Sequence, residues 1–212
     1  MGNIKAVIFD FGGVIITPIT RQIGMIADDL GCSASDLHHI LMGPQFESGD
    51  HPWHQLERGE IEMPQLQGML TPYADAAGVK FRGDEVEKLL APGMYEVNTY
   101  VLEHIEDLRS RGYKTALLSN SIKEFRPKLE ADVPPRLFDA YVDSSHVGMR
   151  KPEAAIFHHT LDALSLTSPT DAVFLDDFQG NLAGAEAVGL RVIHVRDPRV
   201  ALDELELLLS GS

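Results

Sequence analysis

The sequence predicts an α/β fold built on an open parallel sheet with helices on both faces. From about residue 96 onward, short apolar or β-branched runs alternate with helical patterns, as in right-handed βαβ units. Residues 18–91 differ, because they have helical periodicity, several glycines and prolines, and no convincing strand. We therefore expect a Rossmann-like core formed by residues 1–17 and 92–212, interrupted by a helical subdomain at residues 18–91.

The individual elements follow from local patterns. Fully buried parallel strands read as short continuous apolar runs, and five such runs occur at residues 4–9, 115–118, 141–142, 173–175 and 192–194. Residues 99–111 and 153–164 repeat apolar positions at helical spacing, and residues 201–209 form a leucine-rich helical segment. In the insert, helical patterns cover residues 21–30, 35–41, 53–58, 64–76 and 84–90.

Composition excludes several classes of protein. The 212 residues carry a net charge of -14, which argues against nonspecific binding to nucleic acid or to anionic membranes. Cys32 is the only cysteine, so the chain has no intramolecular disulfide and no cysteine-rich zinc site. Neither a signal peptide nor an apolar run of membrane-spanning length is present. We expect a soluble, cytoplasmic monomer or homodimer.

Polar residues follow the predicted strands at the points where the strands end. Asp10 ends the first apolar run, Ser119 and Asn120 end the second, and Asp176 with Asp177 ends the fourth. In open parallel sheets, ligands bind at the carboxyl ends of the strands, so these side chains are expected to converge.

A loop before the predicted helix at 153–164 adds a cation to this group of residues. Lys151 can reach back as a point charge, Arg150 is interpreted as structural or exposed, and Pro152 is expected to open the helix. Two adjacent carboxylates near Asp10 would repel each other unless a cation lay between them, and oxygen ligands suit Mg²⁺. The sequence therefore predicts a Mg²⁺ site beside a phosphate-binding site.

In this order, the residues resemble the haloacid dehalogenase superfamily of aspartyl phosphohydrolases over essentially the whole chain. Residues 9–14 are similar to its first motif, Ser119-Asn120 to the second, Lys151-Pro152 to the third, and Asp176-Asp177 with Asn181 to the fourth. The insert resembles a helical cap of the first type. The first motif and residues 53–59 look closest to the branch that includes the amino-terminal phosphatase domain of soluble epoxide hydrolase.

The resemblance implies a two-step phosphoryl transfer to a small phosphorylated metabolite. Asp10 would attack phosphorus and form an aspartyl-phosphate that water hydrolyses. Mg²⁺ would bind Asp10, the carbonyl of Gly12 and Asp177, with Asp176 acting through water. Phosphoryl oxygens would contact Ser119, Asn120 and the loop at Phe11 and Gly12, while Lys151 balances charge and Asn181 orients the acidic loop.

Position 12 departs from the pattern of the family, which places there an Asp that protonates the leaving group. Gly12 supplies a carbonyl for the metal but no proton. General acid-base catalysis contributes about 10²- to 10⁴-fold, so turnover is expected to be weakened without losing phosphate binding. We hypothesise a preference for good leaving groups, or an acid borrowed from His51, His54 or Glu57 in the cap, although histidines beside a core Trp53 more often pack than catalyse.

Two other functions stay open. A carbon-halogen hydrolase is one, because haloacid dehalogenases of the superfamily also lack the second Asp, although they do not need the paired aspartates at the fourth motif. A protein that binds a phosphorylated ligand without turnover is the other, with Gly12 marking the lost activity. Metal dependence separates the first alternative from a phosphatase.

Overall fold

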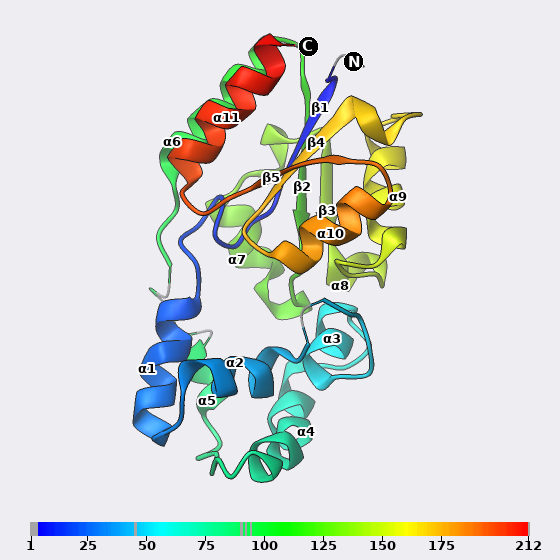
Figure 1. Ribbon diagram of the computed structural model, residues 1–212. Coiled ribbons are helices and arrows are strands. Elements are labelled where there is room, and N and C mark those ends of the chain that lie inside the picture. The colour runs from blue at the N-terminus through cyan, green and yellow to red at the C-terminus, as the bar shows by residue number, and fades with distance from the viewer. Residues whose placement is uncertain (1–3, 45, 90, 92, 94, 212) are drawn as a thin grey trace.

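A single parallel sheet forms the centre of the molecule (Figure 1). The computed structural model describes residues 4–44, 46–89, 91, 93 and 95–211, with the side chain of Arg21 excepted. Within them the strand order is β3-β2-β1-β4-β5. The strands are β1 (Ala6–Phe9), β2 (Lys114–Ser119), β3 (Ala140–Asp143), β4 (Ala172–Asp176) and β5 (Arg191–His194). All neighbouring strands pair in parallel, as the alternating pattern predicts.

Register brings the polar strand ends together. Phe9, the last residue of the central strand β1, lies opposite Leu117 of β2 and Leu175 of β4. The chain therefore leaves all three strands at the same edge of the sheet, where Asp10 follows β1, Ser119 ends β2 and Asp176 ends β4.

Helices cover both faces of the sheet, which explains why its strands read as continuous apolar runs. Phe9, Leu117 and Leu175 belong to one apolar cluster, and Ile8, Leu118 and Phe174 belong to the other. On the first face lie α6 (Thr99–Ser110), α7 (Arg126–Asp132) and α11 (Pro198–Ser210), and on the second α9 (Ala154–Ala163) and α10 (Gln179–Ala187). The short α8 (Ser144–Val147) follows β3.

The start of α9 corrects one expectation. Pro152 does not open the helix, which begins at Ala154 with Glu153 at the N-cap position. The residue instead packs against α10, because a side chain added at Gly184 would meet the Pro152 carbonyl oxygen at 2.5 Å. Pro152 thus fixes the loop that carries Lys151 rather than the end of a helix.

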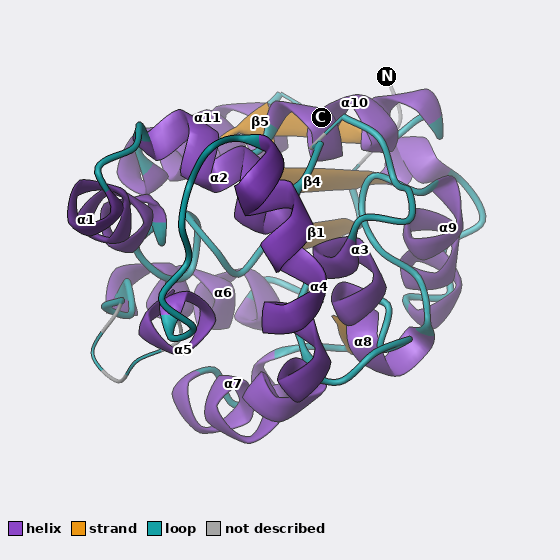
Figure 2. Ribbon diagram, turned by 90° about the horizontal axis from the view of Figure 1, so that it is seen from below, coloured by secondary structure: helices purple, strands orange, loops and turns teal. Residues whose placement is uncertain are grey.

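The described part of the insert forms helices that lie beyond the carboxyl edge of the sheet (Figure 2). They are α1 (Thr20–Leu30), α2 (Ala34–Met42), α3 (Pro52–Glu57), α4 (Met63–Ala76) and α5 (Glu85–Leu89). Residues from all five share an apolar cluster that includes Trp53. The last residue expected for the fifth helix, Leu90, lies outside the described residues.

The two connections to the insert run side by side. Ile16 forms a bridge with Val97, and the Thr17 amide donates to the Glu96 carbonyl over 2.9 Å. The proposed domain bounds include residues 1, 92 and 212, which lie outside the described residues, and the division stays a prediction. Among the described helices, none is long and apolar enough to cross a membrane.

Candidate active site

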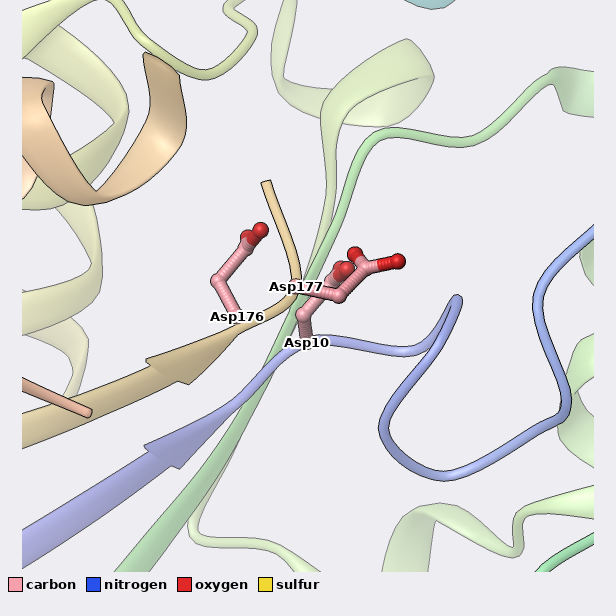
Figure 3. Close-up of side chains that lie close together, drawn as sticks. All are labelled: Asp10, Asp176 and Asp177. Atoms are coloured by element: carbon pink, nitrogen blue, oxygen red, sulfur yellow. The ribbon is translucent and has the colours of Figure 1, made fainter. Parts of the chain in front are cut away.

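Three carboxylates meet at the carboxyl edge of the sheet (Figure 3). Asp10 follows β1, Asp176 ends β4, and Asp177 is the next residue. One oxygen from each lies within 4.8 Å of the others, a spacing that allows a shared cation. Asp10 is 7% exposed and Asp176 is fully buried, so both depend on nearby positive charge.

Lys151 supplies part of that charge. Its Nζ lies 2.6 Å from Asp10 Oδ1 and 2.8 Å from Asp176 Oδ2, and it also donates to the Leu118 carbonyl oxygen over 3.1 Å. Burial lowers the pKa of the Lys151 ammonium, but the charges of Asp10 and Asp176 together raise that pKa above its usual value. Lys151 is therefore a fixed cation between two strand ends rather than a surface lysine.

Asp176 has hydrogen-bond donors on both of its oxygens. Besides Lys151, the Asn181 amide donates to Oδ2 and Oδ1 over 3.0 and 3.2 Å, and the Phe178 N–H donates to Oδ1 over 2.7 Å. This arrangement fits a carboxylate that orients its neighbours more than one that ligates a metal directly. Asn181 thus contacts the acidic loop where the motif places it.

The negative charge of the three carboxylates exceeds the positive charge that Lys151 supplies. Burial raises the pKa of Asp177 to about 7, with the nearby Asp176 charge adding to the effect. Burial also raises the pKa of Asp10 well above its usual range, and the Lys151 charge offsets this only in part. Three carboxylates around one ammonium have the donor set and the excess negative charge that suit a hard divalent cation.

Two consecutive glycines shape the loop after Asp10. Gly13 has a φ of 69°, and a side chain added there would lie 2.1 Å from Asp177 Oδ2, so Gly13 allows the acidic loop to approach. A side chain added at Gly12 would meet nothing within 4 Å. Open space therefore lies where the superfamily carries its second Asp.

Ser119 and Asn120 lie at the end of β2, but their side chains have different surroundings. Ser119 is 2% exposed and lines the cavity beside Asp10. The Asn120 side chain is tied to the Lys151 backbone, since its Oδ1 accepts from the Lys151 N–H over 2.9 Å and its Nδ2 donates to the Lys151 carbonyl over 3.1 Å. Asn120 therefore positions the Lys151 loop as well as facing the cavity.

A cavity of about 220 Å³ lies between the sheet edge and the inserted helices. At its sheet end are Asp10, Phe11, Gly12, Ser119, Asn120, Lys151 and Asp177, which brings together nearly all of the predicted site residues. Asp176 lies behind them, fully buried. The opposite wall is formed largely by apolar residues of the insert. The sequence patterns predicted these residues as part of the core, but did not predict that they line a cavity.

Glu57 and Arg150 form a contact that the sequence did not reveal. Arg150 is 2% exposed, and its Nε donates to Glu57 Oε2 over 2.7 Å, while Trp53 Nε1 donates to Oε1 over 2.8 Å. Glu57 also lines the cavity, with Asn120 Nδ2 3.5 Å from Oε2. This buried ion pair joins α3 of the insert to the loop that carries Lys151.

The two candidate histidines of the insert lie elsewhere. His51 and His54 are 7% and 0% exposed, and neither is among the described residues that line the cavity. Burial lowers the pKa of each to about 4, with the charges of His39 and Arg150 respectively the next cause. Both rings are therefore packed and neutral at neutral pH.

The sequence profile of haloacid dehalogenase-like hydrolases matches residues 4–189. The chain belongs to this family. The motifs at Asp10, Ser119, Lys151 and Asp176 thus predicted the family correctly, and the chain is a haloacid dehalogenase-like hydrolase.

Curated relatives of this hydrolase include longer proteins. Mouse acyl-CoA dehydrogenase family member 10 is 31% identical over 97% of this chain, and rat bifunctional epoxide hydrolase 2 is 28% identical over 96%. The chain spans only 19% and 38% of the length of these two proteins. The sesquiterpene phosphatase astK of Aspergillus oryzae is 28% identical over 97% of this chain and 96% of its own. A dehalogenase also matches: (S)-2-haloacid dehalogenase 4A of Burkholderia cepacia, at 24% identity over 91% of this chain and 83% of its own.

Solved structures share the fold of this hydrolase. A HAD-like family hydrolase from Porphyromonas gingivalis superposes with a TM-score of 0.70 at 21% identity, covering 97% of this chain and 98% of its own. A HAD family enzyme from Bacteroides thetaiotaomicron, solved with magnesium and inorganic phosphate, gives a TM-score of 0.63 at 19% identity and covers 92% and 96% of the two chains. At these identities the likeness shows a common fold.

Proposed function

We propose that this hydrolase is a Mg²⁺-dependent phosphatase that acts on a small phosphorylated metabolite through an aspartyl-phosphate on Asp10. The observation that carries the proposal is the arrangement of Asp10, which lines the cavity with one oxygen fixed on Lys151 and with Asp177 beside it. Similarity to a sesquiterpene phosphatase, and to a fold solved with magnesium and phosphate, supports this choice of reaction.

The reaction assigned to Asp10 is nucleophilic substitution at phosphorus. Lys151 holds Oδ1 at 2.6 Å, which leaves the second oxygen to attack. As the new O–P bond forms, the bond from phosphorus to the leaving oxygen breaks and the leaving group takes the electron pair. Water then attacks the aspartyl-phosphate, which releases inorganic phosphate and restores the Asp10 carboxylate.

Asp10, Asp177 and the carbonyl of Gly12 would hold Mg²⁺, which when bound neutralises charge on the phosphoryl group. Asp176 would act through the orientation of Lys151 and of the acidic loop, because its oxygens already accept from protein donors. Ser119 and the backbone of Asn120 would contact phosphoryl oxygens at the end of β2. Phe11 and Gly12 complete this end of the cavity.

Among the described residues, the acids proposed from the sequence are engaged in other contacts. Gly12 has no side chain, and Glu57 accepts hydrogen bonds on both oxygens from Trp53 and Arg150. His51 and His54 are packed outside the described cavity wall. A phosphate whose leaving group departs without protonation, such as an aryl or acyl phosphate, fits this set of residues.

A metal-dependence experiment tests the proposal against the dehalogenase alternative, which the Burkholderia relative favours. Release of phosphate from phenyl phosphate and of chloride from (S)-2-chloropropionate is measured with Mg²⁺ and with EDTA, using Asp10→Asn as the blank. We expect phosphate release that both EDTA and Asp10→Asn abolish. Chloride release that persists in EDTA would instead support the dehalogenase, and no Asp10-dependent release of either product would support a protein that only binds phosphorylated ligands.

A further inference from the structure

The cavity has two chemically different ends. Its sheet end holds the carboxylates and Lys151, whereas the wall formed by the insert and by the loop after β2 is largely apolar, with Thr20, His38, Glu57 and Ser121 as its polar members. The apolar residues of this wall come from several elements. Ile19 precedes α1 and Ile23 lies on α1, Met42 is on α2 and Trp53 on α3, and the loop after β2 adds Ile122 and Phe125. A phosphate ester with its phosphorus at Asp10 must place its organic group against these side chains.

Two of the polar groups facing this space already have partners. The Tyr95 hydroxyl donates to Asp132, and the Glu57 oxygens accept from Trp53 and Arg150. The His38 ring stacks on Phe178 at 6.0 Å with an interplanar angle of 6°. The side chains of Ile19, Ile23 and Phe125 offer no hydrogen-bond partner, so a substrate hydroxyl placed against these three residues would lose water without gaining a matched partner.

Gly12 leaves further room for an apolar organic group. Because a side chain at position 12 would meet nothing within 4 Å, the space next to the reacting phosphorus is wider than an Asp there would allow. An aromatic or branched group can therefore lie close to the phosphoryl end without meeting a charged side chain at that position.

From the cavity wall we infer that the substrate is the phosphate monoester of an uncharged, predominantly apolar phenol or alcohol, with Ile19, Ile23 and Phe125 among the residues that select its organic group. This inference rests on the proposed phosphatase function and narrows its substrate class. Selectivity arises because burying apolar surface against the wall is favourable, while an unpaired hydroxyl there is costly.

A pair of nearly isosteric substrates tests the inference. 4-Propylphenyl phosphate and 4-(2-hydroxyethyl)phenyl phosphate differ by one methyl in place of one hydroxyl, and their leaving groups are similar phenols. We expect kcat/KM to favour the propyl compound about tenfold, within the range set by the cost of an unpaired hydroxyl. We also expect kcat/KM to rise up to about fourfold for each methylene from phenyl to 4-propylphenyl phosphate, until the cavity is filled.

Substitutions at Ile19, just before α1, and at Met25, on α1, locate the selecting wall. Ile19 is half-buried on the cavity, whereas Met25 of α1 is 62% exposed and is not among the described lining residues. Ile19→Asn should reduce the preference for propyl over hydroxyethyl by about threefold or more, because it offers the hydroxyl a partner. Ile19→Val and Met25→Asn should keep the preference, and thermal unfolding identifies any variant that fails to fold.

Equal kcat/KM for the propyl and hydroxyethyl compounds, or a preference for the hydroxyl, would overturn the inference while leaving Asp10-dependent phosphatase activity in place. If no aryl phosphate is hydrolysed in an Asp10-dependent manner, the proposed function fails instead. Calorimetric binding of 4-propylphenylphosphonate and 4-(2-hydroxyethyl)phenylphosphonate with Mg²⁺ then decides the inference. Tighter binding of the propyl compound by the wild type supports it, and equal affinities contradict it.

Discussion

At the scale of single residues, Gly12 and Gly13 are neighbours with opposite steric surroundings. Gly13 has a positive φ and lies against Asp177, while Gly12 faces open space. The sequence assigned Gly12 the place of the missing Asp, but it did not reveal that Gly13 lies against Asp177, because that contact depends on the folded acidic loop.

An alanine at each glycine should therefore have different effects. Gly13→Ala forces the Asp177 side chain to move, so we expect the Mg²⁺ concentration for half-maximal activity to rise about tenfold or more, as for a disturbed ligand shell. Gly12→Ala should change that concentration less than about twofold, because the added methyl group meets nothing within 4 Å and the carbonyl of residue 12 is retained. A Mg²⁺ titration of phosphatase activity measures both, and similar curves for the two variants would contradict this account of the loop.

Gly12 also permits a test of the missing acid. Gly12→Asp fits the open space and adds a group that can protonate a leaving alkoxide. We expect kcat/KM on an alkyl phosphate to rise about 10²-fold, the lower end of general-acid effects, and on an aryl phosphate to rise much less. Equal wild-type rates on the two phosphates, with no gain in the variant, would remove the leaving-group explanation.

Among the predicted site residues, those on strand ends could be located from the sequence. Asp10, Ser119 and Asp176 each end an apolar run, and parallel strands bring such ends to one edge. The Glu57–Arg150 pair could not be found this way, because its partners are 93 residues apart and neither lies on a strand. The tie between the Asn120 amide and the Lys151 backbone likewise depends on the folded loop.

At the scale of elements, the strands and longer helices were predicted well. A strand buried on both faces appears in the sequence as a continuous apolar run, and a helix buried on one face repeats its apolar residues at helical spacing. The expected runs fall within or beside β1 to β5, and α6, α9 and α11 match their patterns to within a few residues. The short α7 and α8 were not predicted, because one or two turns contain too few apolar repeats to form a pattern. Pro152 was misplaced because the packing against Gly184 has no signal in the sequence.

Helix α3 combines structural and site residues in two turns. His51 caps its start by accepting from the Trp53 N–H over 3.2 Å, and His54 Nδ1 accepts from the Gly49 N–H over 3.2 Å. Trp53 and Glu57, one turn apart, hydrogen-bond to each other and reach the cavity. The two histidines thus stabilise the helix that places Glu57 at the cavity and against Arg150.

The depressed pKa values of these histidines predict a pH dependence of stability. In the folded state the pKa of His54 is about 4, below the value of about 6.5 expected when unfolded, because of burial and the charges of Arg150, His51 and Arg58. The unfolded chain therefore takes up a proton first as the pH falls. The stability that neutral His54 contributes is complete above about pH 6.5 and is lost progressively toward pH 4.

His54→Gln isolates this contribution, since glutamine can accept from Gly49 but does not titrate. We expect the free energy of unfolding of the wild type, relative to the variant, to fall by about 2 kcal/mol between roughly pH 7.5 and pH 5. Urea unfolding at several pH values measures the difference. A constant difference across this range would mean that His54 is not buried in its neutral form.

At the scale of the whole molecule, the site is completed by contacts between the insert and the core. Besides Glu57–Arg150, Arg58 Nη1 lies 3.4 Å from Glu153 Oε1, and Lys123 Nζ donates to the Gly59 carbonyl over 2.7 Å. Of these contact residues, Glu57 also lines the cavity between the two parts. The alternation of strands and helices predicted the core, but the shape of this cavity depends on long-range packing that no local pattern records.

We expect Asp10 to become phosphorylated during turnover. Mass spectrometry of the protein, quenched in acid during hydrolysis of an aryl phosphate with Mg²⁺, measures this directly. The account predicts a phosphoryl group on the peptide that contains Asp10, sensitive to hydroxylamine and absent in Asp10→Asn and in EDTA. Steady hydrolysis that continues in Asp10→Asn, or that proceeds with no phosphoryl group on Asp10 at any time point, would contradict it.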